Sequence, residues 1–591
     1  MRRSVVESDR ISIVATLMVG AVLLAMLVVV ARVAQLQTRP SRRLVDNTPS
    51  STSIRHEIAR RGDLLDRRGR VLATSRIGYR LFVDPGIVED VDTLAIELGR
   101  LLGVNPVDLD RKIQERYDTR YVRLVPLLSE AQTVAIESCR IRGVGLEPVL
   151  VRQRPYSDLA APLIGHVGAD HKGLSGVEYA IDGRLTGDPG ELRYLRDVRR
   201  RAMWVEPVGY RPARDGHDVR LSIDIELQRI AEEELDAIVA KHNAGGGRLL
   251  VMDPRTGEIL AAADTLRSRP GFDDYALDPG RSLNPALGRP RWITDPYEPG
   301  STFKPFVWAA ATRLQLAQPE EVFETYHGVF RTSKGRRIRD SHPYEELSWD
   351  MVLVKSSNIG MAQVAERMTH AQMQQVVNEF GFGRPTGVGL PGETDGIVTP
   401  PAKWNHYSQT SVSMGHEIAV TPIQMIRAFS AFAGDGRLPL PTLFAVDSPA
   451  TERNPEPLRA IVEQRSLPES IAYQTRLVLR RVMLEGTGRA ANEGARYQMF
   501  GKSGTAQLPN RKAGGYHEDR YVVSFIAGAP LERPRLVALC VVEDPDKSRG
   551  YHGGGAVAGP VVRNVLNRSL DYLGVEPDVE NETTELATAD P

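Results

Sequence analysis

Cysteine is scarce in this sequence: only two of the 591 residues are cysteines, which excludes a disulfide-rich scaffold. Cys540 lies in a run of Leu, Val and Ala that predicts a buried strand, so we expect a small core residue. The net charge is zero, from 75 basic and 75 acidic residues, and aromatics make up only 6%. Without surplus positive charge, the composition gives no indication of a nucleic-acid partner. The twelve histidines are scattered and no Cys/His group has metal-ligand spacing, so we expect neither metal nor cofactor.

One long run lacks charge altogether. Residues 11–31 are mostly Val, Leu, Ala, Ile and Met, and as a helix such a run spans about 30 Å, the thickness of a bilayer core. A cleaved signal peptide is the alternative, but its apolar region is usually shorter, about 7–15 residues, and no Ala-x-Ala site follows directly. We therefore predict a retained transmembrane helix after a short tail, residues 1–10. Arginines flank the run on both sides, so the positive-inside rule does not decide its orientation.

The segments after this helix differ in pattern. Residues 32–55 are polar and predict a linker. The next stretch, 61–73, predicts two strands around an Asp-Arg-Arg-Gly turn at residues 66–69, and helical periodicity follows over 92–102, 106–117 and 129–138. These three helices indicate a small inserted subdomain.

The second half of the chain predicts an α+β domain of about 240–570. A strand is expected over 219–228 and a helix over 228–241, followed by a hairpin around residues 253–257. The middle, 303–432, is mostly helical, and apolar strands return near 521–528 and 535–543 before a last amphipathic helix that ends at Gly574. Strands at both ends with helices between them favour layered helices and sheet. The acidic residues 571–591 predict a disordered tail.

The stretch from Glu298 to Lys304 carries the first chemical motif. Pro299 and Gly300 predict a turn, and a buried helix follows from about residue 303. This places Ser301 near a helix N-terminus, where free N–H groups can stabilise an oxyanion. Residues three apart share a helix face, so Lys304 can reach the Ser301 hydroxyl and act as its base if its pKa is lowered. Alone, Ser-x-x-Lys occurs by chance about once or twice in a chain of this length.

Two further motifs follow in order: Ser356-Ser-Asn358 and Lys502-Ser503-Gly504-Thr505. This triple is found in penicillin-binding proteins and class A β-lactamases. The chain resembles a class B penicillin-binding protein, a monofunctional peptidoglycan transpeptidase. Arg-Gly-Asp-Leu-Leu-Asp-Arg-Arg-Gly at 61–69 and Gly-Leu-Ser-Gly-Val-Glu at 173–178 resemble signatures of the N-terminal pedestal of that class, here residues 56–225.

The resemblance implies a five-stranded antiparallel sheet with helices on both sides. It also implies the roles of the site residues. Ser301 is the nucleophile and Lys304 its base, while Ser356 shuttles a proton and Asn358 holds the substrate amide. Lys502 attracts the substrate carboxylate, which Ser503 and Thr505 bind, and Gly504 lets the acyl chain approach the backbone. The N–H groups of Ser301 and Thr505 form the oxyanion hole. Arg61, Asp66 and Glu178 are expected to form an interdomain charge network.

The implied reaction is cross-linking of D-Ala-D-Ala stem peptides through a serine acyl-enzyme, with β-lactams acylating the same serine. The implied location is the inner membrane, as a single-pass protein whose catalytic domain is periplasmic. Implied partners are a membrane glycosyltransferase of the SEDS type and divisome proteins. Segments such as 284–304 and 551–560 resemble the septal, cell-division type, whereas Ser503 stands where septal enzymes more often carry threonine. Elongation-type transpeptidase, D,D-carboxypeptidase and non-enzymatic scaffold remain the alternatives.

Overall fold

The computed structural model describes residues 2–39, 52–197, 202–266, 289–445, 464–510, 514–550 and 553–579. The chain divides into two compact units, one made of Met1–Ile58 with Pro189–Arg214 and the other of Ala59–Asp188 with Asp215–Pro591.

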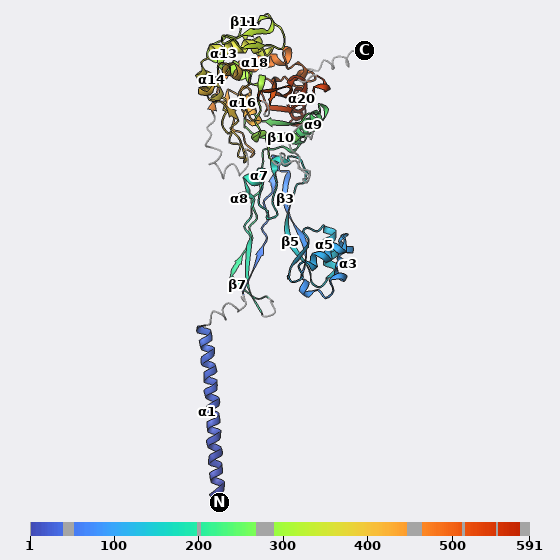
Figure 1. Ribbon diagram of the computed structural model, residues 1–591, viewed down its shortest axis with the longest axis vertical. Helices are drawn as coiled ribbons and strands as arrows, with labels where there is room; N and C mark the ends of the chain where they lie inside the picture. Colours follow the sequence, from blue (N-terminus) through green and yellow to red (C-terminus); the bar gives the residue numbers. More distant parts are fainter. Residues whose placement is uncertain are drawn as a thin grey trace, which may run out of the picture. The chain divides into compact units, whose positions relative to one another are not determined.

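The first unit contains helix α1 and a three-stranded sheet (Figure 1). α1 runs over Arg2–Thr38, and its part Ser12–Thr38, whose most apolar 18-residue window has a mean hydropathy of 2.9, is long and apolar enough to cross a membrane. The antiparallel sheet has the order β1-β6-β7, with β1 at Thr52–Glu57, β6 at Gly190–Arg196 and β7 at Ala202–Arg211. The ends of the expected linker thus lie in α1 and β1, and residues 40–51 lie outside the described residues.

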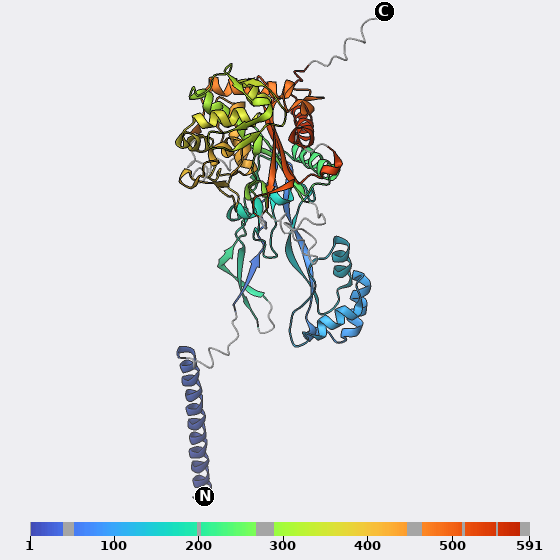
Figure 2. The same ribbon diagram turned by 45° about the horizontal axis from the view of Figure 1, so that its top comes forward.

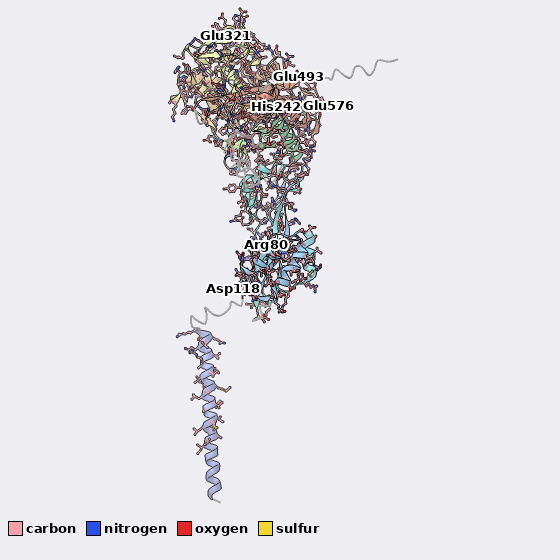
Figure 3. All side chains as sticks on the ribbon, turned by 45° about the vertical axis from the view of Figure 1, so that its right-hand side comes forward. Arg80, Asp118, His242, Glu321, Glu493 and Glu576 are labelled. Atoms are coloured by element: carbon pink, nitrogen blue, oxygen red, sulfur yellow. The ribbon has the colours of Figure 1, made fainter. Side chains whose placement is uncertain are left out.

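The N-terminal region of the second unit (residues 59–188) is built on one long hairpin. β3 (Val71–Val83) pairs along its length with β5 (Val144–Gln153), and its other partners are β2 (Leu64–Leu65) and β4 (Val122–Val125). Between β3 and β5 lie the three predicted helices: α3 (Val91–Leu102), α4 (Pro106–Gln114) and α5 (Glu130–Cys139). They begin at the N-caps Asp90, Asn105 and Ser129 and enclose a small apolar core. Figure 3 labels Arg80, which lies on β3, and Asp118, which lies in the inserted subdomain.

Buried charges join the signature segments of this region. Arg61 Nε donates to Glu178 Oε2 at 2.7 Å, and Arg152 Nε donates to Glu178 Oε1 at 2.8 Å. Only 1% of the Glu178 side chain and 2% of the Arg61 side chain are exposed. Arg61 also donates to Asp182 at 2.6 Å. The predicted link between Arg61 and Glu178 is therefore present, and it lies within the N-terminal region.

Asp66 belongs to a different group of charges. Its carboxylate accepts from Arg70 Nε at 2.6 Å, and Arg70 Nη2 donates to Asp224 Oδ1, also at 2.6 Å. Asp224 is the N-cap of α9 (Ile225–Lys241), where it accepts from the N–H of Glu226. Arg61 and Glu178 thus belong to one group of charges and Asp66 to another, where a single network was expected. The reason is that the turn at 66–70 faces the start of α9, whereas Arg61 faces α7 (Gly176–Ala180).

Replacing Glu178 by alanine should weaken the N-terminal region without abolishing acylation. The change leaves Arg61 and Arg152 buried without their shared carboxylate, a loss that typically costs about 3–5 kcal/mol. Hydrogen exchange of the β2–β3 amides should therefore speed up. Glu130→Ala is the matched control, because the Glu130 carboxylate pairs with Arg76 but is 91% exposed. A folded Glu178→Ala protein that no longer binds penicillin covalently would contradict this separation of roles.

The predicted catalytic domain is organised around a five-stranded sheet, as expected (Figure 1). All neighbouring strands are antiparallel, and the order is β10-β9-β21-β20-β19. Their bounds are β9 Gly246–Met252, β10 Ile259–Leu266, β19 Phe500–Pro509, β20 Tyr516–Ala529 and β21 Leu536–Glu543. Because β19 is at one end of this order, the Lys-Ser-Gly-Thr motif at residues 502–505 lies on an edge strand.

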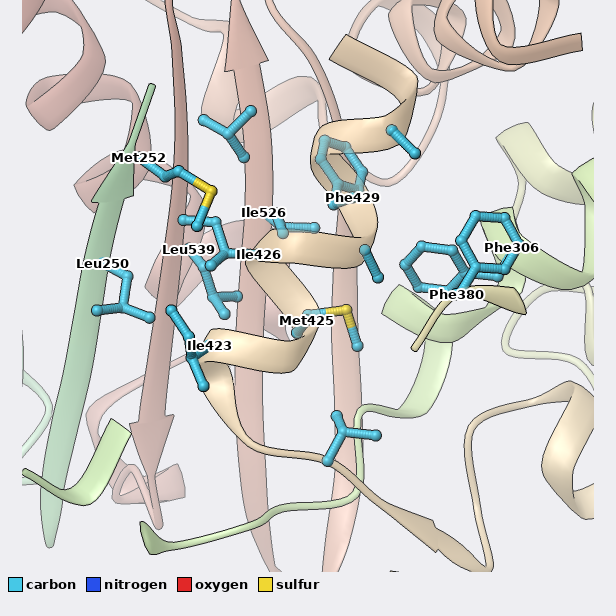
Figure 4. Packing of buried hydrophobic residues seen from close by; sticks show 14 of the residues in the cluster. Leu250, Met252, Phe306, Phe380, Ile423, Met425, Ile426, Phe429, Ile526 and Leu539 are labelled. Atoms are coloured by element: carbon cyan, nitrogen blue, oxygen red, sulfur yellow. The ribbon is translucent and has the colours of Figure 1, made fainter. Parts of the chain in front are cut away.

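Helices cover both faces of this sheet (Figure 2). Alternate residues of each strand point to opposite faces. Leu249 and Cys540 pack in the core with α9 and α20 (Gly554–Tyr572), which confirms Cys540 as a core residue. Leu250, Met252, Ile526 and Leu539 point to α16 (Pro422–Ala433) on the other face (Figure 4). Cys139, in contrast, is exposed.

The other helices of this domain lie between β10 and β19 in sequence, as predicted. Their bounds are α10 Arg291–Thr294, α11 Lys304–Arg313, α12 Trp349–Val354, α13 Asn358–Arg367, α14 His370–Glu379, α15 Ser408–Ser413, α18 Glu469–Glu485 and α19 Arg489–Asn492. Short strand pairs connect them: β11 Val322–Glu324 with β14 Glu346–Ser348, β12 Val329–Arg331 with β13 Arg337–Arg339, β15 Ile397–Val398 with β16 Ile418–Ala419, and β17 Arg437–Leu438 with β18 Gln464–Arg465.

Two expected boundaries move. The strand expected over 219–228 is only β8 (Val219–Arg220), because Asp224 caps a helix that starts at Ile225. The tail expected from residue 571 begins as ordered chain: α20 ends at Tyr572, and the Val575 carbonyl accepts from the Tyr497 hydroxyl at 2.7 Å. Residues 580–591 lie outside the described residues.

Candidate active site

Ser301 lies in a tight turn whose backbone requires glycine at the preceding position, Gly300. Residues Gly300–Phe303 form a 3-10 turn that leads directly into α11, so Ser301 is at the start of a helix, as predicted. Gly300 has φ +53°, and a Cβ there would lie 2.7 Å from the Thr505 carbonyl. Its N–H donates to the Gly415 carbonyl at 3.0 Å. The turn is therefore fixed between the edge strand β19 and the segment that follows α15.

Lys304 is fully buried and meets the second motif. Its Nζ donates to the Ser356 carbonyl at 2.6 Å and to Asn358 Oδ1 at 2.7 Å. Burial lowers the Lys304 pKa to about 7, while the Asp340 carboxylate opposes part of this shift. Lys304 can therefore be neutral near neutral pH, where an ordinary lysine stays charged, and its Nζ then carries a lone pair. The neutral amine has two N–H groups, which can donate to the Ser356 carbonyl and to Asn358 Oδ1. The lone pair on Nζ then stays available to accept a hydroxyl proton.

The direct Ser301–Lys304 contact expected from their spacing is not formed. In the described part of the chain, no hydrogen bond joins the Ser301 hydroxyl to Lys304 Nζ. The reason is the strong attraction of Lys304 to Ser356 and Asn358. Catalytic hydrogen bonds are often long without substrate and tighten when it binds, so this geometry is compatible with the base role.

The Ser356 hydroxyl lies between the two lysines. Lys502 Nζ donates to Ser356 Oγ at 3.0 Å, and Lys304 Nζ is 3.4 Å from the same oxygen. Ser356 has φ +61°, a strained value for a residue with a side chain. Burial, with a further contribution from the nearby Lys304 charge, holds the Lys502 pKa well below its ordinary value. The three motifs thus meet in one chain of hydrogen bonds.

Asp340 holds this strained loop in place. It accepts from Ser357 Oγ at 2.6 Å and from the N–H groups of Asn358 and Ile359 at 2.5 and 3.1 Å. Sequence reasoning missed Asp340, because it follows β13 in a polar stretch that is typical of any surface turn. The second motif thus lies where the loop after α12 enters α13, and Asp340 fixes the conformation of this loop.

The Lys-Ser-Gly-Thr motif lies on β19 beside the serine, as expected. The Ser503 hydroxyl donates to Thr487 Oγ1 at 2.8 Å, and the Thr505 hydroxyl, which is exposed, accepts from the Gly554 N–H at 3.3 Å. Gly504 also has a packing reason. A Cβ there would lie 2.7 Å from the Pro299 carbonyl, so the glycine lets β19 pack against the serine turn. The approach of the acyl chain to the Gly504 backbone stays a prediction.

A hydroxyl at a helix start, a buried lysine that is partly neutral and a second lysine on an edge strand define a class of acyl-transferring serine enzymes. Comparison with known proteins agrees. Residues 247–567 match the family model described as penicillin binding protein transpeptidase domain, and residues 56–221 match the penicillin-binding protein dimerisation domain.

Curated relatives match along nearly the whole chain. Stage V sporulation protein D of Bacillus subtilis (strain 168) is 32% identical over 88% of this chain and 79% of the relative. Peptidoglycan D,D-transpeptidase FtsI of Escherichia coli (strain K12) is 30% identical over 95% of this chain and 92% of the relative. A peptidoglycan synthetase structure from Bifidobacterium adolescentis, 24% identical, covers 90% of this chain and 98% of its own with a TM-score of 0.67, which shows a shared fold. The chain belongs to the class B penicillin-binding proteins.

Proposed function

We propose that this protein is a serine-type D-Ala-D-Ala transpeptidase that cross-links the stem peptides of peptidoglycan. Ser301 attacks the D-Ala–D-Ala bond, its proton passes to Lys304, and the terminal D-Ala leaves. An amine of a second stem then attacks the acyl-enzyme and forms the cross-link. The observation that carries the proposal is the position of Lys304, which is buried, has a pKa of about 7 and is hydrogen-bonded to the second motif.

The third motif would hold the carboxylate of the donor. Burial and the nearby Lys304 charge lower the Lys502 pKa, and a bound carboxylate would raise it, so substrate binding would bring a proton with it. Ser503 and Thr505 would add hydroxyl contacts. Asn358 Nδ2 donates one hydrogen to the Arg339 carbonyl at 2.9 Å, so its second hydrogen is available for the substrate amide. A β-lactam would acylate Ser301 in the same way.

Two other functions would use the same residues differently. A D,D-carboxypeptidase passes the acyl group to water, and a scaffold does no chemistry. The dimerisation domain matched over residues 56–221 supports a cross-linking enzyme, because it is the hallmark of class B in this family. Cross-linked dimer as the main product of donor and acceptor stems supports transpeptidation, whereas tetrapeptide alone indicates a carboxypeptidase.

The membrane placement follows from α1. We infer that residues 1–10 are cytoplasmic, that Ser12–Thr38 crosses the inner membrane once, and that the catalytic domain is periplasmic. Peptidoglycan is cross-linked outside the cytoplasm, so only this orientation brings Ser301 to its substrate. A SEDS-type membrane glycosyltransferase and divisome proteins are the proposed partners.

Within class B, we infer the septal role. Segments 284–304 and 551–560 resemble those of division-type enzymes, and the relatives include proteins named FtsI. Ser503 is the feature that favours the elongation type, but the hydroxyl chemistry of Ser and Thr is nearly equivalent. The elongation-type transpeptidase therefore stays the alternative.

Depletion of the protein should block septation and give filamentous cells, with a fluorescently tagged copy at mid-cell. The physical reason is that new septal wall needs cross-links at the division site. Fluorescence microscopy of depleted and tagged cells measures both effects. Rounded cells that still divide, with label dispersed along the side wall, would assign the protein to elongation.

A further inference from the structure

A cavity of about 770 Å³ lies beside the serine turn. We call it the Glu298 cavity; six residues that line it are Tyr297, Glu298, Glu417, Ala506, Gln507 and Tyr516. Glu298 is three residues before Ser301, and Ala506 directly follows Thr505. The cavity therefore borders the chain on both sides of the contact between Gly300 and Thr505, next to the turn that carries Ser301. It continues along the end of β19, where an extended strand advances about 3.4 Å per residue.

Glu298 is held rigidly in this cavity. Its Oε1 accepts from the Tyr516 hydroxyl at 2.7 Å and from the Glu417 N–H at 3.1 Å, and its Oε2 is 3.1 Å from His416 Nδ1. Burial and the hydrogen bond to Glu298 raise the Tyr516 pKa, so the phenol stays protonated and keeps donating. His416 thus contacts a cavity residue. Sequence reasoning missed this group, because Glu298 and Tyr516 are 218 residues apart.

The cavity has an excess of negative charge. Its arginines are already paired: Arg248 with Glu543 at 2.5 Å and Arg289 with Asp295 at 2.9 Å. Glu298 and Glu417 are the remaining carboxylates, and in the described ranges no lysine or arginine forms an ion pair with either. Only 12% of the Glu298 side chain is exposed, so its charge is weakly screened by solvent. Such a site favours a cation with N–H donors.

We propose that the Glu298 cavity binds the side-chain ammonium of the acceptor stem peptide, the group that attacks the acyl-enzyme; this rests on the proposed transpeptidase function. The bound ammonium first releases one proton to solvent water and becomes a neutral amine. Its nitrogen then forms the C–N bond while the C–O bond to Ser301 breaks. The second proton leaves the nitrogen and returns to Ser301 Oγ through Lys304. Glu298 contacts the amine and so helps to select it over water.

The test compares acceptor use by full-length protein in detergent: wild type, Glu298→Gln and Tyr516→Phe, with Glu346→Gln as an exposed control carboxylate on β14. The donor is an uncharged N-acyl-D-alanyl thioester, and the acceptor is a stem tripeptide with a free side-chain amine. The ratio of amide to hydrolysed acid is measured as acceptor concentration rises. Gln keeps the neutral hydrogen bonds but loses the charge.

For Glu298→Gln, the acceptor concentration that gives half-maximal aminolysis should rise at least about tenfold. This is the factor expected for the loss of one charge-assisted hydrogen bond. Penicillin acylation should stay within about twofold. Added salt should weaken acceptor use by the wild type and much less by this variant. Tyr516→Phe, which loses only a hydroxyl, should shift in the same direction by a smaller factor.

Three outcomes would overturn the proposal. An unchanged amide-to-acid ratio in Glu298→Gln and Tyr516→Phe would show that the cavity does not bind the acceptor. Slower acylation only by an amine-bearing stem pentapeptide would place the ammonium on the donor. An equal loss of acylation and aminolysis with the salt response retained would show a structural role. A wild type that penicillin does not acylate would instead contradict the proposed function itself.

Discussion

Replacement of Ser301 by alanine should abolish covalent labelling of the protein by a fluorescent penicillin. An acyl-enzyme needs the Ser301 oxygen, and the neighbouring hydroxyls are committed elsewhere: Ser357 donates to Asp340, and Ser356 lies between two lysines. Neither the Ser356 nor the Ser357 hydroxyl is therefore expected to replace Ser301 as the nucleophile. Labelled protein on a gel, with mass spectrometry of the labelled peptide, measures the effect.

The fold should survive this change. The Ser301 side chain is only half-buried and, in the described part of the structure, makes no hydrogen bond that its loss would break. The melting temperature should therefore stay close to that of the wild type. Ser333→Ala, which removes an exposed serine hydroxyl of the same domain, is the matched control and should label normally. Labelling that persists undiminished in Ser301→Ala would show that another residue is the nucleophile.

Loss of the Lys304 amine should slow acylation by at least ~10²–10⁴, the usual contribution of a general base. Lys304→Met keeps an unbranched side chain in the buried position but leaves the Ser356 carbonyl and Asn358 Oδ1 without their donor, so the melting temperature is measured beside the rate. Lys304→Arg tests charge against basicity, because arginine stays protonated at neutral pH. Both variants should be slow if the amine is the base. Near wild-type rates in Lys304→Arg would show that only positive charge is required.

The acylation rate should rise with pH if Lys304 is the base. Only neutral Lys304 can accept the serine proton, and its pKa is about 7. The acylation rate should therefore be low at pH 5, rise through about pH 7 and level off above it. Because Lys502 shares Ser356 with Lys304, the profile belongs to the coupled pair of lysines. Stopped-flow acylation across pH 5–9 measures it, and a flat profile between pH 6 and 8 would contradict the base assignment.

The sequence alone determined the features that are local along the chain. Three short motifs in order identified Ser301 and Lys304 and the residues that meet them. Alternation and helical periodicity predicted the sheet and the helices of the inserted subdomain, because burial on one face imposes a period on the sequence. The uncharged run near the N-terminus predicted the span in α1, since length and hydropathy suffice for that prediction.

Only the tertiary structure decided how distant segments meet. Asp340 orders the second motif, and the Lys304 amine is hydrogen-bonded to Ser356 and Asn358 and not to Ser301 in the described structure. Gly504 serves the packing of β19, and the expected charge network of Arg61, Asp66 and Glu178 divides into two. These contacts join residues far apart in the chain, such as Ser356 with Lys502 and Pro299 with Gly504, so no local pattern encodes them. Their geometry is set by which faces of the sheet and helices are buried against each other, and that is a property of the packed molecule.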